Sequence, residues 1–163
     1  MEISENRPAF IVSPIVDKEL GPENIKNLTK LSNAIKIEAE NRNIEAHLIL
    51  VGGCVDQKKQ GKFHKDIDLV LYSPDLSSET IPKNECPKFD KFASFISDVA
   101  KSLDWESKII LPWFRDIENS ADGSVVLSTN DKPIEILPVR EDFISDSFED
   151  YIKSERRPFA VIF

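Results

Sequence analysis

Hydrophobic positions recur along the chain with two spacings, and each spacing predicts one kind of element. Apolar side chains three or four positions apart predict amphipathic helices over residues 22–43 and 89–103. Short apolar runs bounded by turn-forming residues predict β-strands. These runs cover residues 48–51, 66–72, 107–111, 124–129 and 132–139, with an edge strand within 10–16 and a final strand or partner surface at 159–163.

The predicted helices and strands are interspersed, which constrains the fold class. The chain contains no internal repeat and no low-complexity linker, and its 163 residues are about the length of one domain. Asn130-Asp131 separates two predicted strands and is suited to the turn of a hairpin. We therefore expect a single α+β domain over residues 1–163, with helices packed on a sheet.

Composition narrows the setting in which the protein works. Hydrophobic residues make up 40% of the chain and charged residues 31%, which is typical of a globular domain. No apolar run approaches the roughly 20 residues that span a bilayer, and the polar N-terminus does not resemble a signal peptide. Cys54 and Cys86 form neither a disulfide framework nor a metal-ligand pair by spacing. We expect a cytoplasmic protein without membrane association, in which Cys54 is a small buried residue.

The charge balance argues against binding of an extended nucleic acid and in favour of a small anionic ligand. The chain has 21 Lys and Arg against 29 Asp and Glu, a formal net charge of -8, and such a surface repels the backbone of an extended nucleic acid. Lysines nevertheless cluster at positions 58, 59, 62 and 65. A local basic patch on an acidic protein favours a small anionic ligand.

Candidate chemistry is concentrated in residues 51–71. In the strand predicted from Asp66, alternate side chains share a face, so Asp66 and Asp68 are expected to point one way and Ile67 and Leu69 into the core. Two adjacent carboxylates repel each other and gain nothing from burial. A hard cation between them would remove the repulsion, and oxygen ligands of this kind favour Mg²⁺.

The segment before these carboxylates has the features of a phosphate site. Gly52-Gly53 ends the preceding strand, and residues without side chains let a ligand approach the backbone closely. A short helix over residues 54–60 would direct its N-terminus towards an anion, and the nearby lysines would add positive charge. Together with a metal-binding Asp pair, these features predict a nucleoside-triphosphate site.

This segment resembles the signature of the polymerase-beta-like nucleotidyltransferase superfamily. The shared features are an apolar strand, Gly-Gly, a spacer of this length and then Asp-apolar-Asp-apolar at residues 66–69. That family uses a third acidic residue on a later strand. Glu135 is the candidate, and its neighbours Ile134 and Ile136 would face the opposite way. Parts of the segment are similar to CCA-adding enzymes and poly(A) polymerases, to lincosamide-type enzymes and to antitoxin-type minimal members, and the subfamily stays open.

The resemblance implies a fold, a reaction and a set of site residues. The fold would be a nucleotidyltransferase-like mixed sheet flanked by helices. Two Mg²⁺ ions, with Mn²⁺ as an alternative, would be held by the catalytic residues Asp66, Asp68 and Glu135. The nucleotide would be bound by Gly52, Gly53, Lys62 and Lys65. A nucleoside monophosphate would pass from the triphosphate to a hydroxyl group of a small molecule or a protein.

Other interpretations of the same residues remain open. Gly52-Gly53 alone is typical of a strand-ending turn, the lysines individually are typical of a solvated surface, and His64 is more typical of a structural residue than of a ligand. The fold could serve as a non-catalytic nucleotide-binding or antitoxin-type module, with residues 159–163 contacting a second copy or another chain. An unrelated α+β domain that carries the motif by chance is the third interpretation.

Overall fold

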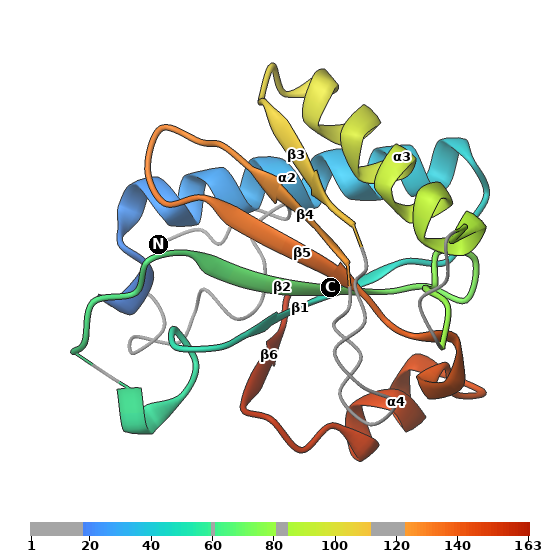
Figure 1. Cartoon of the computed structure of the whole chain (residues 1–163). Coiled ribbons are helices and arrows are strands. Elements are labelled where there is room, and N and C mark those ends of the chain that lie inside the picture. Colours follow the sequence, from blue (N-terminus) through green and yellow to red (C-terminus); the bar gives the residue numbers. More distant parts are fainter. Residues whose placement is uncertain (1–17, 60, 81–84, 112–122) are drawn as a thin grey trace.

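The computed structural model describes residues 18–59, 61–80, 85–111 and 123–163, and the strand predicted within 10–16 lies outside these residues. A six-stranded mixed sheet has helices on both sides, which confirms the α+β class (Figure 1). The elements are α2 (Pro22–Asn41), β1 (His47–Val51), η2 (Gln57–Lys59), β2 (Ile67–Tyr72), α3 (Pro87–Ser102), β3 (Ser107–Ile110), β4 (Ser124–Leu127), β5 (Ile134–Pro138), η3 (Glu141–Phe143), α4 (Phe148–Ser154) and β6 (Phe159–Val161).

The sheet combines antiparallel and parallel pairs in the order β3-β4-β5-β2-β1-β6. β1 is antiparallel to both β2 and β6, while β2 and β5 are parallel neighbours. β4 and β5 form the antiparallel pair predicted on either side of Asn130-Asp131. Because β2 and β5 are adjacent, the two strands that carry the candidate acidic residues lie side by side.

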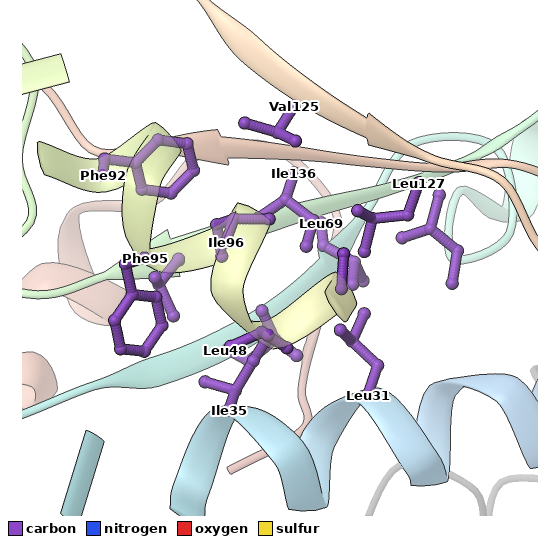
Figure 2. Packing of buried hydrophobic residues seen from close by; sticks show 14 of the residues in the cluster. Leu31, Ile35, Leu48, Leu69, Phe92, Phe95, Ile96, Val125, Leu127 and Ile136 are labelled. Carbon is purple, nitrogen blue, oxygen red and sulfur yellow. The ribbon is translucent and has the colours of Figure 1, made fainter. Parts of the chain in front are cut away.

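The main core lies between the sheet and the helices α2 and α3. Figure 2 shows Leu31 and Ile35 pointing from α2 into the cluster, with Leu48 of β1 beside Ile35 and Ile96 of α3 in the same cluster. Most of the periodic apolar positions predicted for both helices are buried here, because each helix turns one apolar stripe towards the sheet. These two helices therefore cover one face of the sheet and leave the other face for different contacts.

The second face carries a smaller apolar cluster and the short helix α4 (Figure 1). Side chains along β2 alternate between the faces: Ile67 and Leu69 belong to the main core, whereas Val70 belongs to the smaller cluster. Asp68 shares the face of Val70 by the same alternation. The site thus lies on the face opposite α2 and α3.

The C-terminal segment forms a strand, which was one of the two outcomes expected for it. β6 pairs with β1, and Ile162 beyond it is buried in the main core. No helix in the described part of the chain is long and apolar enough to cross a membrane.

Candidate functional site

Asp68 and Glu135 are direct neighbours across the parallel pair of β2 and β5. The register places Asp68 opposite Glu135, and both side chains are half-buried. Ile134 and Ile136 on either side of Glu135 are fully buried in the main core, so Glu135 is on the second face, as predicted. Asp66 is half-buried and lies one residue before β2 begins. The fold therefore places two predicted site residues, Asp68 and Glu135, side by side on adjacent strands although they are far apart in the sequence.

Burial and the neighbouring carboxylates together change the pKa of Asp68. Burial, followed by the negative charges of Asp66 and Glu135, raises the pKa of Asp68 from 3.8 to about 6. The positive charge of Lys59 acts in the opposite direction and lowers this pKa. Asp66, Asp68 and Glu135 thus lie close enough for their negative charges to interact.

Few polar partners offset this charge. The Ser124 hydroxyl on β4 donates a hydrogen bond to Glu135 Oε2 over 2.9 Å. Within the described ranges, no group donates a hydrogen bond to the side-chain oxygens of Asp66 or Asp68. A half-buried carboxylate without a donor and with like-charged neighbours is electrostatically costly, and a bound cation would relieve that cost.

Gly52 is required by the position of Asp68. A Cβ atom added to Gly52 would lie 2.6 Å from Asp68 Oδ2, and the φ angle of Gly52 is +82°, which favours glycine. Val51 just before it is paired with Asp68 across β1 and β2. Asp68 of the chain itself occupies the space beside Gly52, and the approach of a ligand to this backbone stays a prediction.

Gly53 makes room for a second side chain, the ring of His64. A Cβ atom at Gly53 would lie 2.3 Å from His64 Nδ1. His64 Nε2 lies 3.0 Å from Glu19 Oε2, and the Gly61 amide donates to Glu19 Oε1 over 2.7 Å. These bonds, with that from Gly61 as the larger cause, lower the pKa of Glu19. Glu19 thereby contacts Gly61 and His64, at the two ends of a short segment that precedes Asp66.

The predicted helix over residues 54–60 is wrong for residues 54–59, the part that the structure describes. A turn follows Gly52, whose carbonyl accepts from the amides of Val55 and Asp56, and only the 3-10 turn η2 comes after it. The positive φ of Gly52 reverses the chain into this turn. The described part of the segment therefore has no α-helix whose N-terminus could bind an anion.

The lysines are distributed differently from the prediction. Lys62 and Lys65, the predicted nucleotide ligands, are both exposed. Lys59 is also exposed, and its charge is the one that acts on Asp68. Their contact with a nucleotide stays a prediction, and Lys59 joins Lys62 and Lys65 as a candidate.

Two further sequence-based interpretations can be checked. Cys54 is buried, and burial raises the pKa of its thiol, as expected for a structural rather than a nucleophilic cysteine. His64 is almost fully buried in its contact with Glu19, which gives it a structural partner.

The acidic side chains of the site can be compared with the ligands that a hard divalent cation requires. In the described residues, no group of three or more His, Cys, Asp and Glu side chains is arranged to hold a metal ion. Mg²⁺ is commonly held by one or two carboxylates, with water and substrate phosphates completing the coordination. Asp68 and Glu135, which are paired across β2 and β5, would be the two carboxylates of such a site, and Asp66 would add negative charge beside them.

A cavity of about 440 Å³ opens on the same face of the sheet. Val70 and Leu137 line it, and each follows an acidic residue, Asp68 or Glu135, by two positions on its strand. Two positions along a strand correspond to roughly 6–7 Å. Tyr151 of α4 also lines the cavity. The cavity therefore begins two residues further along β2 and β5 than Asp68 and Glu135.

Several site residues were missed by sequence reasoning. Ser124 and Glu19 contact site residues that are 11 and 45 positions away in the chain, so no local pattern identifies them. The cavity depends on α4, for which a signal existed: Ser147 is followed three positions later by Asp150, a typical helix start.

Comparison of the chain with protein-family models, with curated proteins and with solved structures finds no match.

Proposed function

We propose that this protein is a metal-dependent nucleotidyltransferase that transfers a nucleoside monophosphate to a hydroxyl group. The observation that carries the proposal is the pairing of Asp68 with Glu135 on adjacent parallel strands. Burial, followed by the charges of Asp66 and Glu135, raises the pKa of Asp68. Acidic side chains rarely gather at a half-buried position without a cation. The Gly-Gly turn and the lysines beside this pair supply a setting for phosphate groups.

Each group has a role in the proposed reaction. Asp68 and Glu135, with Asp66, would hold Mg²⁺, which when bound would neutralise the phosphate charge and polarise the α-phosphate. The acceptor hydroxyl oxygen forms a bond to the α-phosphorus, and the bond from that phosphorus to the β-phosphate oxygen breaks. Pyrophosphate leaves with the electron pair, and the hydroxyl proton passes to a carboxylate or to water.

The segment between β1 and β2 would hold the leaving group. Lys59 lies within electrostatic reach of Asp68, and Lys62 and Lys65 are on the same segment. Ammonium groups bind phosphate oxygens as compact point charges. Gly52 and Gly53 keep the turn close to Asp68 and His64, so the lysine-bearing segment starts beside the carboxylates.

A transfer assay tests the proposal. The protein is incubated with Mg²⁺ and each of the four nucleoside triphosphates labelled at the α-phosphate, and a panel of hydroxyl compounds and the protein itself serve as acceptors. We expect magnesium-dependent transfer that falls at least about a hundredfold in Asp68→Asn and in Glu135→Gln, as for loss of a group that stabilises transition-state charge. Glu40→Gln, which removes an exposed charge on α2, is the matched control.

The outcomes separate the proposal from its alternatives. Binding of a triphosphate without transfer to any acceptor would favour the non-catalytic nucleotide-binding module. Absence of both binding and transfer, with Asp68→Asn indistinguishable from the parent protein, would overturn the proposed function.

A further inference from the structure

The cavity beside the carboxylates has a basic wall on an acidic protein. Arg140, Arg156 and Arg157 line it, together with one acidic residue, Glu155. The chain as a whole carries a formal net charge of -8, so this wall departs from the charge of the whole molecule. The contrast indicates that the cavity is suited to an anion.

The arginines differ in how they are already engaged. Arg157 donates to both carboxylate oxygens of Glu155, over 2.9 and 3.0 Å, and Arg140 donates to Asp142 over 3.0 Å. Arg156 is exposed and makes no ion pair with any residue in the described ranges. Arg156 is therefore the guanidinium best placed to bind a ligand.

Apart from Ser154, the other residues that line the cavity are apolar or aromatic. Its sheet wall includes Val70 and Leu137, and the Tyr151 ring lies in the wall formed by α4. A volume of about 440 Å³ is within the range of cavities that bind small molecules. The lining thus fits a compound with an apolar body and one anionic group.

The position of the cavity distinguishes it from a site for the leaving pyrophosphate. The lysine-bearing segment enters β2 at Ile67, before Asp68, whereas the cavity begins at Val70, after it. Along the chain, Asp68 thus lies between the lysine-bearing segment and Val70, where the cavity wall begins. In phosphoryl transfer, the attacking and leaving oxygens are roughly in line on opposite sides of the phosphorus.

We propose that this cavity binds the acceptor, a small molecule that carries a carboxylate or phosphate group as well as the reacting hydroxyl. The role of the bound molecule as acceptor rests on the proposed function. The preference of the cavity for an anion rests on its lining residues alone. Arg156 holds the anionic group, the apolar wall holds the body, and the hydroxyl is directed towards Asp68 and Glu135. Its oxygen then forms the bond to the α-phosphorus while pyrophosphate leaves, and its proton passes to a carboxylate or to water.

A binding experiment on the full chain tests the cavity without any turnover. The probes are 4-hydroxyphenylacetate, its neutral amide and phenyl phosphate, and the readout is the shift of the methyl NMR signals of Val70 and Leu137 in metal-free protein. We expect both anions to shift these signals and to bind about tenfold more tightly than the amide, the effect of one charge-assisted hydrogen bond.

Variants identify the group responsible. Arg156→Gln is expected to weaken binding of the anions about tenfold and to leave the amide unchanged, while Arg156→Lys retains most of the affinity. Lys153→Gln is the matched control, because Lys153 is an exposed cation of α4 that does not line the cavity. Equal binding of the anions and the amide, or wild-type affinity in Arg156→Gln, would overturn the inference.

A competition experiment separates an acceptor site from a triphosphate site. ATP with Mg²⁺ is expected to leave the bound anion in place; displacement in proportion to ATP would show that the cavity holds the triphosphate and would refute the acceptor assignment. Anion binding together with failure of the transfer assay would refute the proposed function and the acceptor role, and would leave the anion preference supported.

Discussion

At the scale of single residues, the site depends on glycine as much as on acid. Gly52 has no Cβ where Asp68 Oδ2 lies, and its φ of +82° suits a residue without a side chain. Gly21 at the start of α2 has a similar φ of +78°, yet an added Cβ there would meet nothing within 4 Å. A substitution at Gly21 therefore introduces backbone strain alone, whereas a substitution at Gly52 introduces strain and also displaces Asp68.

Substitution of these two glycines gives the first prediction. Gly21→Ala should lower the free energy of unfolding by about 1 kcal/mol through strain alone, and nucleotide binding should not change. Gly52→Ala should cost at least about 2 kcal/mol and should abolish binding of magnesium nucleotide, because the new methyl group displaces the Asp68 carboxylate. Urea unfolding and calorimetric titration measure the two effects. Normal nucleotide binding by Gly52→Ala would contradict this explanation.

The acidity of Asp68 gives a prediction about pH. Its pKa is raised to about 6 in the folded chain from an ordinary 3.8, so between these values the folded chain holds a proton that the unfolded chain has released. The associated stability is fully present below about pH 4 and is lost as pH rises through about 6. Solvent screening at this half-exposed group reduces the effect to about 1 kcal/mol.

Urea unfolding in EDTA at several pH values checks this prediction. The difference in unfolding free energy between Asp68→Asn and the parent protein should increase in favour of the variant from about pH 4 to about pH 7. Glu40→Gln should show no such trend, because Glu40 is exposed. An identical pH dependence in Asp68→Asn and in the parent protein would show that Asp68 does not titrate in this range.

At the scale of elements, the helix α4 links the fold to the cavity. It has only seven residues, and the Ser147 side chain caps it by accepting from the Asp150 amide over 3.1 Å. Its Tyr151 side chain is buried in the smaller cluster and lines the cavity. A helix this short depends on its cap and on packing, because isolated short helices are marginal in water.

Removal of the cap should loosen this part of the cavity. Ser147→Ala should cost about 1 kcal/mol, accelerate hydrogen exchange in residues 148–154 and weaken binding of 4-hydroxyphenylacetate. Ser94→Ala, at an exposed position within α3, is the matched control and should leave exchange in α4 unchanged. Unchanged exchange in Ser147→Ala would show that packing alone holds α4.

The regular elements could be predicted from sequence because their signal is local. The stripe on α2 and the alternation of Ile67, Asp68 and Leu69 each follow from one period, and the structure confirms both. The predicted helix at 54–60 is wrong over its described part, 54–59, because Gly52 has a positive φ and the chain turns there, with the amides of Val55 and Asp56 donating to the Gly52 carbonyl. The Glu19–His64 contact is set by tertiary packing across 45 positions.

At the scale of the whole molecule, one face of the sheet holds the main core and the other holds the candidate site. The face under α2 and α3 holds the main core, and the second face carries the carboxylates, the cavity and α4. The register of β2 with β5 is what joins Asp68 to Glu135, which are far apart in the sequence. Sequence alone predicted both acids and their strands, and only the sheet order establishes that these strands are neighbours.

The paired carboxylates of Asp68 and Glu135 should bind a divalent cation, and titration with Mn²⁺ followed by electron paramagnetic resonance measures this binding directly. The free-ion signal should fall when the parent protein or Glu40→Gln is added, with a further fall when a triphosphate analogue with a methylene group between the α- and β-phosphorus atoms is present. Asp68→Asn and Glu135→Gln should leave the free-ion signal unchanged in the absence of the analogue. Equal Mn²⁺ binding by Asp68→Asn and the parent protein would show that the paired carboxylates do not hold the cation.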